Sequence, residues 1–532
     1  MQLQPTGLNG CWINSKIAKF MKNKELEETY WDILVIGGGA TGVGTAIDAA
    51  SRGYKTLLVE QSDFGKGTSS KSTKLIHGGV RYLQQGNISL VLEALKERAI
   101  LKNNAPHIVH DLNFVVPTYD WWESPFYGIG LKLYDMLAGK EGFGKSEFLS
   151  KEETISYLPT IEQKGLQGGI LYNDGQFDDT RLLISMVLTA EKQGATLLNY
   201  TELVSLAKTN GKICGGIIKN VDTGTTSQIK AKVVINATGV FADAIRKKDL
   251  STAKNRMMGS RGTHIVLDKS FLIGNTAIMI PHTKDGRVLF AVPWHDKLLI
   301  GTTDVEVKEY NLDTVSTDEE IDFLLNHTAQ YLAKDPTRKD IKSIFSGLRP
   351  LVKNKTAENS FEISREHQIE ISENGLISIL GGKWTTYRKM AKDVVNKAST
   401  YAGLPRVKSY THELQLNGYH LNSKIFDDLS IYGSDALEIK KMCDDNTDLE
   451  EKLHKEYPII KAQIVFAVRN EKAKTIEDFL ARRTRLLFLD AKISLDVASI
   501  VAEIMAKELK KNEDWIQEQL ISFQKIASTY LP

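Results

Sequence analysis

The stretch from Asp32 to Glu60 constrains the fold of this chain more than any other part of the sequence. It reads DILVIGGGATGVGTAIDAASRGYKTLLVE, in which an apolar run long enough for one buried strand leads into a glycine-rich turn. A helix-length segment, Val43 to Ser51, follows and ends at Gly53; a second apolar run, Thr56 to Val59, closes the unit on Glu60. The order predicts a unit of strand, tight turn, helix and strand.

The three glycines of the turn, Gly37, Gly39 and Gly42, have the spacing G-x-G-x-x-G. The first permits the tight turn, the second lets backbone approach a pyrophosphate, and the third lets the helix pack closely on the strand. The helix N-terminus offers free N–H groups and positive partial charge to the phosphates. Glu60 can accept hydrogen bonds from an adenosine ribose and argues against a 2′-phosphate. The turn therefore predicts a dinucleotide site for FAD or NAD rather than NADP; a glycine-rich turn without a ligand is the alternative.

Length and composition exclude several classes of protein. The 532 residues suffice for two or three domains, and 42% apolar and 25% charged residues are ordinary for a globular protein. The 68 basic residues nearly balance the 66 acidic ones, so nucleic acid is not an expected partner. The three cysteines lie far apart, which suits a reducing compartment and builds no metal motif. No run approaches the ~20 apolar residues that span a bilayer, and lysines interrupt the N-terminus, so we expect a cytosolic protein.

The rest of the chain divides by pattern. Residues 1–30 are expected to form a loose leader with one short helix, Ser15 to Glu27. Between Arg256 and Asp304, strand-like pieces alternate with turns, which predicts an antiparallel sheet that walls a substrate site. The tail from Phe426 to Leu531 is a series of amphipathic helices, among them Thr475 to Leu487, which predicts a helical cap domain.

Two further glycine turns indicate the size of the cofactor. The strand Ala231 to Gly239 ends on small residues, and Gly381 and Gly382 separate another strand from a helix. Three such turns suit a large extended cofactor, so FAD is favoured over NAD. Because no second dinucleotide motif is visible, we expect a flavoenzyme that takes hydride directly from its substrate.

At this point the sequence resembles the FAD-dependent (aerobic-type) glycerol-3-phosphate dehydrogenases. The resemblance runs from about Asp32 to beyond Asp490, and SSK-x-x-KLIHGG-x-RYL and GGK-x-TTYRK are its most specific motifs. The segments that carry it, in addition to the first glycine turn, are TSSKSTKLIHGGVRYL (Thr68 to Leu83), GTHIVL (Gly262 to Leu267), IGTTDVE (Ile300 to Glu306), SGLRPL (Ser346 to Leu351), GGKWTTYRK (Gly381 to Lys389) and ARRTRLLFLD (Ala481 to Asp490).

The resemblance implies an α/β fold with a Rossmann-like FAD-binding domain of the glutathione-reductase type. To this it adds an antiparallel-sheet substrate domain and a C-terminal all-helical cap. The FAD-binding segments are expected at residues 31–85, 175–245 and 345–400, the substrate-domain segments at 86–174 and 246–344, and the helical domain at 401–532.

The implied reaction is oxidation of sn-glycerol 3-phosphate to dihydroxyacetone phosphate, with FAD as hydride acceptor and quinone as the final acceptor. Along the flavin, the resemblance places two sets of residues beyond the first glycine turn. They are Ser69, Ser70, Ser72, Leu75, Gly78 and Gly79 on one side, and Gly239, Gly382 and Thr385 on the other.

A dianionic phosphate needs fixed cations, which arginine forks and lysine supply best. The candidates in the matching segments are Arg81, Arg349, Arg365 and Lys383, and Tyr82 can add a phenolic hydrogen bond; a surface ion pair is the alternative for each cation.

Removal of the C2 hydroxyl proton requires a base, for which His264 is our first choice. The alternative is a hydrogen-bonded structural histidine. Arg349 can also stabilise the developing alkoxide. His77 is assigned to positioning the loop or the flavin. Thr303 and Asp304 fall near the substrate without an assigned role.

Three other functions compete with this interpretation. A glycerol-3-phosphate oxidase runs the same half-reaction with O2 as acceptor and H2O2 as product, although the insertion known from such oxidases is not evident here. An amine or amino-acid oxidase needs different substrate motifs. A non-catalytic flavin-binding membrane protein would not need Arg81, His264, Arg349 and Lys383 together.

A quinone acceptor implies contact with lipid. Because no spanning segment is present, we expect peripheral association with the inner face of the cytoplasmic membrane, through the aromatic region Trp121 to Tyr127 or through basic amphipathic surfaces. The resemblance also suggests a homodimer.

Overall fold

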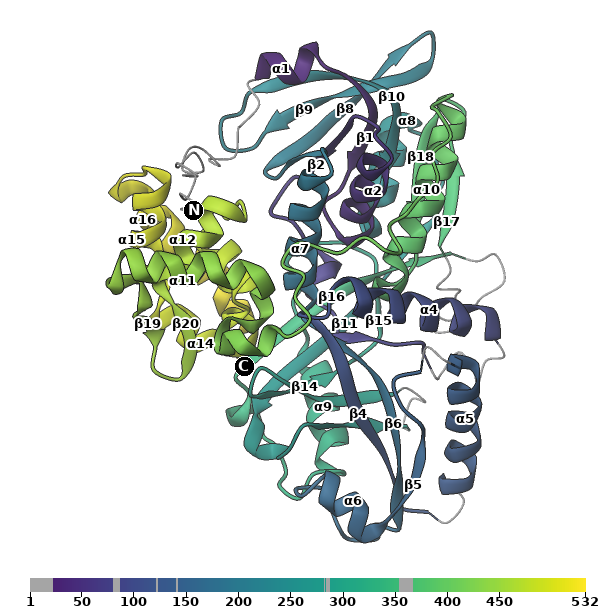
Figure 1. The fold of residues 1–532 in the computed structure, drawn as a ribbon, viewed down its shortest axis with the longest axis vertical. Coiled ribbons are helices and arrows are strands. Elements are labelled where there is room, and N and C mark those ends of the chain that lie inside the picture. Colours follow the sequence, from purple (N-terminus) through teal and green to yellow (C-terminus); the bar gives the residue numbers. More distant parts are fainter. Residues whose placement is uncertain are drawn as a thin grey trace, which may run out of the picture.

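The computed structural model describes residues 23–79, 87–120, 123–139, 142–281, 283, 288–353 and 367–532. Figure 1 shows three parts: a sheet flanked by helices at the top, a second sheet of long strands below it, and a group of helices from the C-terminal part of the chain at one side. This arrangement agrees with the fold class expected from the sequence.

The first sheet contains the glycine-rich unit. Its order is β17-β18-β10-β1-β2-β7, in which the strands from β18 to β7 are parallel, and β8 and β9 extend it beside β10. Its strands are β1 (Tyr30–Ile36), β2 (Thr56–Val59), β7 (Thr196–Leu198), β8 (Thr201–Thr209), β9 (Lys212–Asn220), β10 (Thr226–Asn236), β17 (Gln368–Ile371) and β18 (Leu376–Leu380). The central strands are continuous apolar runs because helices or further strands cover both of their faces.

Helix α2 (Ala40–Ser51) lies against this sheet between α7 (Asp179–Lys192) and α10 (Tyr387–Tyr401). It is almost entirely buried and made of small residues, so its neighbours approach closely. A Cβ built on Gly44 would lie 2.6 Å from the ring of Tyr387 on α10. The sequence therefore predicted the position of this helix correctly, although α2 begins three residues before the expected Val43.

The second sheet follows the order β15-β11-β14-β13-β12-β4-β6-β3, with β16 beside β11 and β5 beside β6. The antiparallel pairing expected between Arg256 and Asp304 is confirmed for β11–β14, β13–β14 and β12–β13, whereas β12 and β4 are parallel. Its strands are β3 (Leu75–Ile76), β4 (Val109–Thr118), β5 (Glu147–Ser150), β6 (Gly168–Phe177), β11 (Met257–Asp268), β12 (Thr276–Ile280), β13 (Leu289–Trp294), β14 (Lys297–Gly301), β15 (Val305–Val307) and β16 (Ser343–Val352).

Two strands of this second sheet come from segments that the sequence placed with the FAD-binding region. β3 pairs with β6, and β16 pairs with β11 along its whole length. In the chain, β3 follows β2 of the first sheet, and β16 is followed by β17 of the first sheet. The chain therefore crosses between the sheets at these two points. These crossings bring residues of both sheets to one junction.

Helices cover the outer faces and edges. Around the second sheet these are α4 (Ile88–Asn104), α5 (Glu123–Ala138), α6 (Lys151–Tyr157) and α9 (Asp318–Ala329); α8 (Ala242–Asp249) follows the first sheet. The leader contributes α1 (Asn23–Glu28), in which Leu26 is buried under the first sheet. Most of the helix expected from Ser15 to Glu27 lies outside the described residues.

The C-terminal part is helical, with two differences from the expectation. A hairpin of β19 (Lys452–His454) and β20 (Tyr457–Ile460) interrupts it. Buried and exposed side chains alternate along β20, as in a strand with one buried face. The helix expected from Thr475 to Leu487 is a short π-helix, Asp478–Arg483, that ends before a left-handed residue, Arg485. The α-helices are α11 (Ala436–Asp445), α12 (Lys461–Asn470), α13 (Leu486–Leu489), α14 (Ala491–Asp496), α15 (Ala498–Leu509) and α16 (Glu513–Ala527).

Candidate active site

The glycine turn between β1 and α2 leaves no room for side chains. A Cβ on Gly37 would lie 2.7 Å from the carbonyl oxygen of Ala237, and a Cβ on Gly42 would lie 1.9 Å from the carbonyl oxygen of Gly37. Gly37 also has φ +108°, which L-residues rarely adopt. Gly39 caps α2 without a side-chain hydrogen bond of its own, and the N–H of Ala40 donates to Ser69 Oγ at 3.0 Å. Gly39, Ala40 and Thr41, at this helix start, line an open space.

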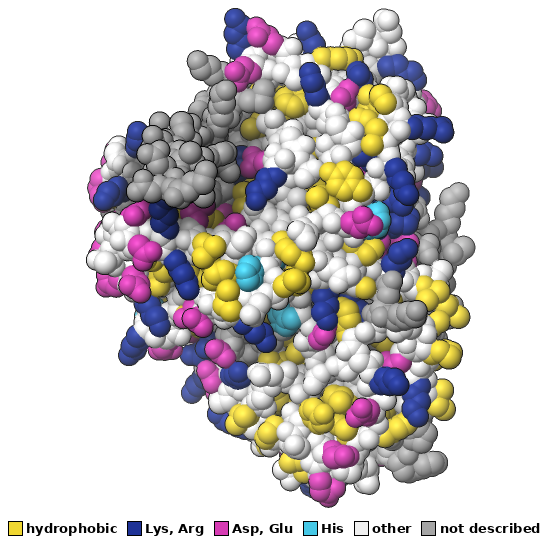
Figure 2. Space-filling model, in the orientation of Figure 1, with side chains coloured by type: hydrophobic (Ala, Val, Ile, Leu, Met, Phe, Trp, Pro, Cys, Tyr) yellow, Lys and Arg dark blue, Asp and Glu magenta, His cyan; other side chains and the backbone are white. Residues whose placement is uncertain are grey.

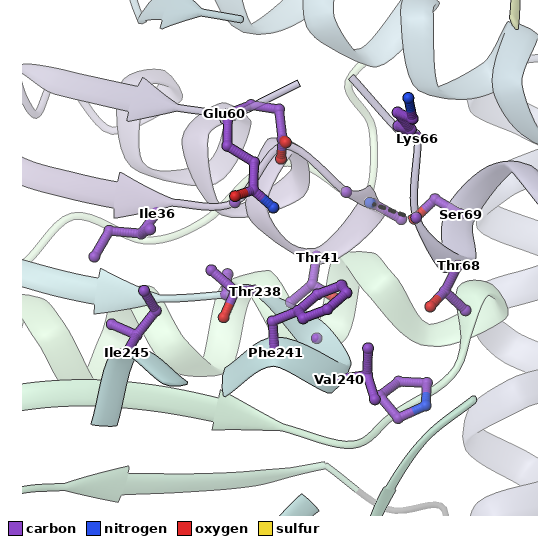
Figure 3. Close-up of a pocket in the computed structure, with 18 of the residues that line it drawn as sticks. Ile36, Thr41, Glu60, Lys66, Thr68, Ser69, Thr238, Val240, Phe241 and Ile245 are labelled. Atoms are coloured by element: carbon purple, nitrogen blue, oxygen red, sulfur yellow. Dashed lines mark hydrogen bonds between the residues drawn. The ribbon is translucent and has the colours of Figure 1, made fainter. Parts of the chain in front are cut away.

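Glu60 forms one wall of that space (Figure 3). Its Oε2 accepts a hydrogen bond from Gly38 N at 2.6 Å, and its Oε1 accepts one from Ser62 N at 2.9 Å. Burial raises the pKa of this carboxyl group, while the two backbone hydrogen bonds oppose the shift. The carboxylate therefore stabilises the turn itself and retains lone pairs for a ligand hydroxyl.

A cavity of about 370 Å³ opens from this turn. That volume lies within the range of small-molecule and cofactor sites. The predicted cofactor residues that line it are Gly37, Gly39, Glu60, Ser69, Gly239 and Gly382. A Cβ on Gly239 would meet nothing within 4 Å, but its φ of +58° favours glycine there. Figure 3 shows Phe241 and Ile245, which the sequence did not single out, facing the same space.

The other predicted cofactor residues lie in different places. Ser72, Leu75 and Thr385 line a second cavity. Gly42 packs beneath the turn, and three more residues are buried outside the linings of both cavities: Ser70, Gly78 and Gly79. The N–H of Gly78 donates to the hydroxyl of Tyr134 at 2.9 Å, which indicates a packing role for that glycine.

The second cavity has a volume of about 200 Å³ and adjoins the first. Lys383, Thr68 and Pro350 line both. The second cavity also contains the candidate base and the candidate arginine, His264 and Arg349, together with the other histidine of the sequence motifs, His77. The structure thus brings His264, Arg349 and Lys383 to one place together with His77. They come from β11, from β16, from the turn after β18 and from the end of β3.

Arg349 extends from β16 and is held by several acceptors. Its Nη2 donates to the carbonyl oxygen of Thr303 at 3.0 Å and to Thr302 Oγ1 at 3.1 Å, and its Nη1 lies 3.3 Å from Asp304 Oδ1. A Cβ on Gly262 would lie 2.7 Å from Nη2, so only glycine leaves room for the guanidinium beside β11. Asp304 therefore orients the arginine, which is the role that the sequence left unassigned.

His264 is almost completely buried on β11. Its Nε2 lies 2.9 Å from Thr73 Oγ1, and its ring stacks on Phe345 with centroids 4.8 Å apart. Burial, with the cations Lys74 and Arg349, holds the pKa of this imidazole well below its usual value. The ring is therefore neutral near pH 7.

Thr303 is buried beneath the site rather than exposed to it. Its hydroxyl donates to Glu320 at 2.6 Å and accepts from Thr263 N at 2.9 Å. Glu320 also accepts from Thr263 Oγ1 and pairs with Arg261. This buried network fixes the start of α9 against β11 and gives Thr303 a structural role.

Two residues that the sequence analysis did not select line the second cavity, Lys71 and Thr73. Burial lowers the pKa of Lys71 to about 8, and its Nζ donates to the carbonyl oxygen of Leu312 at 2.7 Å. Both belong to the motif SSKSTK, in which serines and glycines were taken as the cofactor contacts. The only sequence signal for them was their place in an unusually polar segment.

Three predicted substrate residues, Arg81, Tyr82 and Arg365, lie outside the described residues. Their placement stays a prediction.

Comparison with known proteins identifies relatives over nearly the whole chain. Residues 32–388 match the family model described as FAD dependent oxidoreductase, and residues 376–516 match that of the C-terminal domain of alpha-glycerophosphate oxidase. The chain is 40% identical to the mitochondrial glycerol-3-phosphate dehydrogenase of Homo sapiens, over 93% of this chain and 73% of that one. It is 37% identical to the mitochondrial glycerol-3-phosphate dehydrogenase of Arabidopsis thaliana, over 94% of this chain and 86% of that one.

Solved structures agree with this. The glycerol-3-phosphate dehydrogenase of Bacillus halodurans, complexed with FAD, superimposes with a TM-score of 0.79 and 29% identity over 96% of each chain. The L-alpha-glycerophosphate oxidase of Mycoplasma pneumoniae shares the fold over 72% of this chain and 97% of its own, with a TM-score of 0.55 and 18% identity.

Proposed function

Because the chain belongs to the family of FAD-dependent glycerol-3-phosphate dehydrogenases, we propose that it oxidises sn-glycerol 3-phosphate to dihydroxyacetone phosphate with quinone as the final electron acceptor. The observation that carries the proposal is the pair of adjoining cavities. One is walled by the glycine turn and Glu60, the other holds His264 and Arg349, and Lys383 lines both.

The first cavity fits FAD on its own geometry. A side chain at Gly37 or Gly42 would collide with backbone, and the start of α2 lines the space that a pyrophosphate needs. Gly37, Gly39, Glu60, Ser69, Gly239 and Gly382 would hold the cofactor. Bound FAD supplies the two-electron acceptor for the hydride that leaves C2 of the substrate.

The phosphate of the substrate is bound by cations in this proposal. Arg349 offers a planar fork that is already oriented by Asp304, and Lys383 has its ammonium nitrogen buried at the junction of the two cavities. Arg81, Tyr82 and Arg365 remain additional candidates from the sequence. A preoriented guanidinium loses little freedom when an anion binds.

His264 is the proposed base for the C2 hydroxyl proton. Its imidazole is neutral because burial, with the cations Lys74 and Arg349, lowers its pKa. The negative charge of a phosphate near Arg349 would offset the part of this shift that the cations cause. Thr73 Oγ1 contacts Nε2 and fixes the orientation of the ring. His77 lines the same cavity and is the alternative base; its sequence-based assignment is to position the loop.

Peripheral contact with lipid is part of the proposal, because quinones reside in membranes. No helix within the described ranges is long and apolar enough to cross a bilayer. Tyr127, one of the aromatic residues chosen for lipid contact, is buried, and Trp121 and Trp122 lie outside the described residues.

Helix α5 offers another surface. Ile129, Leu133 and Met136 are exposed at helical spacing along it, and yellow side chains follow the edge of Figure 2 where α5 lies. Lys132 is on the same helix, with its ammonium nitrogen 4.8 Å from the centroid of the Phe148 ring. This combination suits the headgroup region of an anionic membrane. Flotation with anionic liposomes tests it: wild type should float, and the triple variant Ile129→Gln, Leu133→Gln, Met136→Gln should not.

An anaerobic absorbance spectrum tests the reaction. Glycerol 3-phosphate should bleach the flavin band of the purified holoprotein, whereas glycerol should not. A quinone analogue should then restore the band faster than air does; faster reoxidation by air would favour the oxidase that the C-terminal family match keeps open. An unchanged band would refute the substrate. Loss of bleaching in His264→Asn but not in His77→Asn would assign the base.

A further inference from the structure

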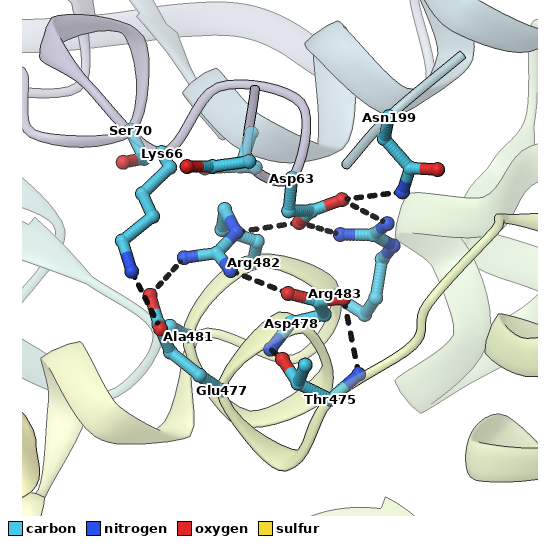
Figure 4. A network of polar contacts seen from close by, with 12 residues as sticks. Asp63, Lys66, Ser70, Asn199, Thr475, Glu477, Asp478, Ala481, Arg482 and Arg483 are labelled. Carbon is cyan, nitrogen blue, oxygen red and sulfur yellow. Dashed lines mark hydrogen bonds and ion pairs between the residues drawn. The ribbon is translucent and has the colours of Figure 1, made fainter. Parts of the chain in front are cut away.

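Three arginines of the C-terminal helical part are buried against the cofactor-binding part. Arg482, Arg483 and Arg485 are at most 3% exposed. Arginine is almost never buried unless it is paired. Figure 4 shows two of them, Arg482 and Arg483, meeting carboxylates at the boundary between the two parts. The acceptors on the cofactor side lie on the segment between β2 and β3, which we call loop 61–74, and at the start of α7.

The first anchor of loop 61–74 is Asp63. Its carboxylate accepts from Arg482 Nε at 2.5 Å and from Arg483 Nη1 at 2.7 Å. Burial by itself would raise the pKa of Asp63, but the two guanidinium groups lower it to about 2. Asp63 is therefore ionised at neutral pH and fixed between two cations, shortly after Glu60 in the wall of the cofactor cavity.

The second anchor is Arg485. Its Nη2 donates to Asp179 Oδ1 at 3.0 Å and to the carbonyl oxygen of Ser70 at 3.1 Å, and its Nη1 donates to Thr180 Oγ1 at 2.5 Å. Arg485 has φ +66°, a left-handed conformation that is uncommon for a non-glycine residue. Such a conformation persists where the surrounding contacts determine it. One guanidinium thus bridges the loop and α7.

Asp179 continues this bridge back to the loop. Its Oδ2 accepts from Ser72 Oγ at 2.7 Å and from Lys74 Nζ at 2.6 Å, and Lys74 Nζ also donates to the carbonyl oxygen of Ser70 at 2.7 Å. Burial lowers the pKa of Lys74 to about 7 in spite of Asp179. Arg485 therefore joins Lys74 at the same carboxylate, one at each oxygen of Asp179.

The opposite side of loop 61–74 contacts the active site at three points. Ser69 Oγ accepts from Ala40 N at 3.0 Å, at the first residue of α2. Thr68 Oγ1 donates to the carbonyl oxygen of Leu348, the residue before Arg349, at 2.6 Å. Thr73 Oγ1 lies 2.9 Å from His264 Nε2. A displacement of the loop therefore affects the helix start, the arginine strand and the base together.

We propose that Arg485 is a positioning residue, which acts through loop 61–74 to hold Ser69 at the cofactor cavity and Thr73 at His264. The C-terminal helical part is then a component of the active site although none of its residues lines either cavity. The inference rests on the proposed function for its kinetic part only; its structural part concerns contacts within the chain.

The central variant is Arg485→Met, which retains most of the side-chain volume. It removes the three contacts above together with one to the carbonyl oxygen of Ala481 at 2.8 Å. The matched control is Arg469→Met, in the same part of the chain, where the guanidinium makes a bidentate pair with Glu508 at 2.7 and 3.0 Å on an exposed surface. Hydrogen exchange of the cofactor-free proteins is measured first. We expect the amides of residues 66–74 to exchange about tenfold faster in Arg485→Met while those of β1 and β10 stay unchanged.

The second measurement is the rate of flavin reduction at saturating glycerol 3-phosphate, in a double-mutant cycle with Thr73→Val. Arg485→Met should slow reduction about tenfold alone and far less in the Thr73→Val background, because coupled residues are not additive. Exchange and reduction rates equal to those of Arg469→Met, or effects that multiply, would overturn the proposal. Wild type that is not reduced at all would instead refute the proposed function, and the exchange data would still test the positioning role.

A variant that fails to fold does not end the test. Arg485→Lys keeps the charge but offers one nitrogen to acceptors that the arginine reaches with two. Faster exchange of residues 66–74 in this variant supports the proposal, and exchange at the wild-type rate overturns it.

Discussion

Replacement of Gly42 by alanine tests the geometry of the glycine turn directly. The Cβ of alanine would lie 1.9 Å from the carbonyl oxygen of Gly37, whereas ordinary contact begins at 3.4 Å. The start of α2 must therefore move about 1.5 Å away from the turn, or the turn must move away from the helix. Neither partner is a flexible side chain, because the obstructing atom belongs to the backbone.

The cost follows from this displacement. Overpacking a tight site costs about 1–3 kcal/mol, and a backbone obstacle places Gly42→Ala near the upper end. Alanine in a helix recovers about 0.5–1 kcal/mol relative to glycine. The net loss is then about 2 kcal/mol. If the displacement appears as lost contact between the helix start and the pyrophosphate, FAD affinity falls about 30-fold.

The assay is titration of the cofactor-free protein with FAD, followed by flavin fluorescence. The control is Gly130→Ala in α5, where a Cβ would meet nothing within 4 Å and the helix should become slightly more stable. FAD affinity in Gly42→Ala equal to that in Gly130→Ala would refute the reasoning, because it would mean that the turn yields without cost.

Three further outcomes are expected. Arg349→Lys removes the guanidinium fork that Asp304 orients, so kcat/KM for glycerol 3-phosphate should fall about 10–150-fold while FAD content stays constant. The control is Arg338→Lys, which removes an exposed fork that contacts Asp318 and Asp322 and should leave kcat/KM unchanged. Glu60→Gln replaces one of the two carboxylate oxygens that accept from backbone N–H groups by an NH2 donor. FAD titration should then show affinity about tenfold weaker, and unaltered affinity would contradict the role of the carboxylate. The pKa values of Asp63 and Glu477 are lowered from 3.8 and 4.5 to about 2. The stability that these carboxylates contribute is therefore present above about pH 4.5 and is lost as the pH falls to about 2. Acid unfolding curves should show this loss of stability, and the loss should be smaller in Asp63→Asn.

The sequence predicted the parts of the fold that depend on local chemistry. β2 matches its predicted bounds. The helix α2 ends at the expected residue, because Gly53 adopts the positive φ that residues with a Cβ rarely adopt. The antiparallel pieces of the second sheet were also recognisable, since their turns and apolar runs recur at short spacing. The assignment of β16 to that sheet was not, because it depends on pairing with β11 far along the chain.

The candidate site shows the same limit. His264 and Arg349 were chosen from motifs, and the structure places both in one cavity. The partner of His264 was missed, because Thr73 lies 191 residues from it. The contact between Asp179 and Arg485, which spans 306 residues, was missed for the same reason. Apolar periodicity also treats a charged residue as solvent-exposed. It therefore predicted a regular helix where the structure has a π-helix, a left-handed residue and three buried arginines.

The polar character of loop 61–74 explains why distant residues must hold it. Ordering a residue costs about 1–2 kcal/mol in backbone entropy, which most segments offset by burying apolar side chains. Few side chains of this loop are apolar, although Phe64 is completely buried. Its order must come mainly from polar contacts, and these come from α2, from β16 and from the C-terminal arginines. A segment that is free of bulky apolar groups can follow a cofactor closely, but only a scaffold on its other side can keep it there.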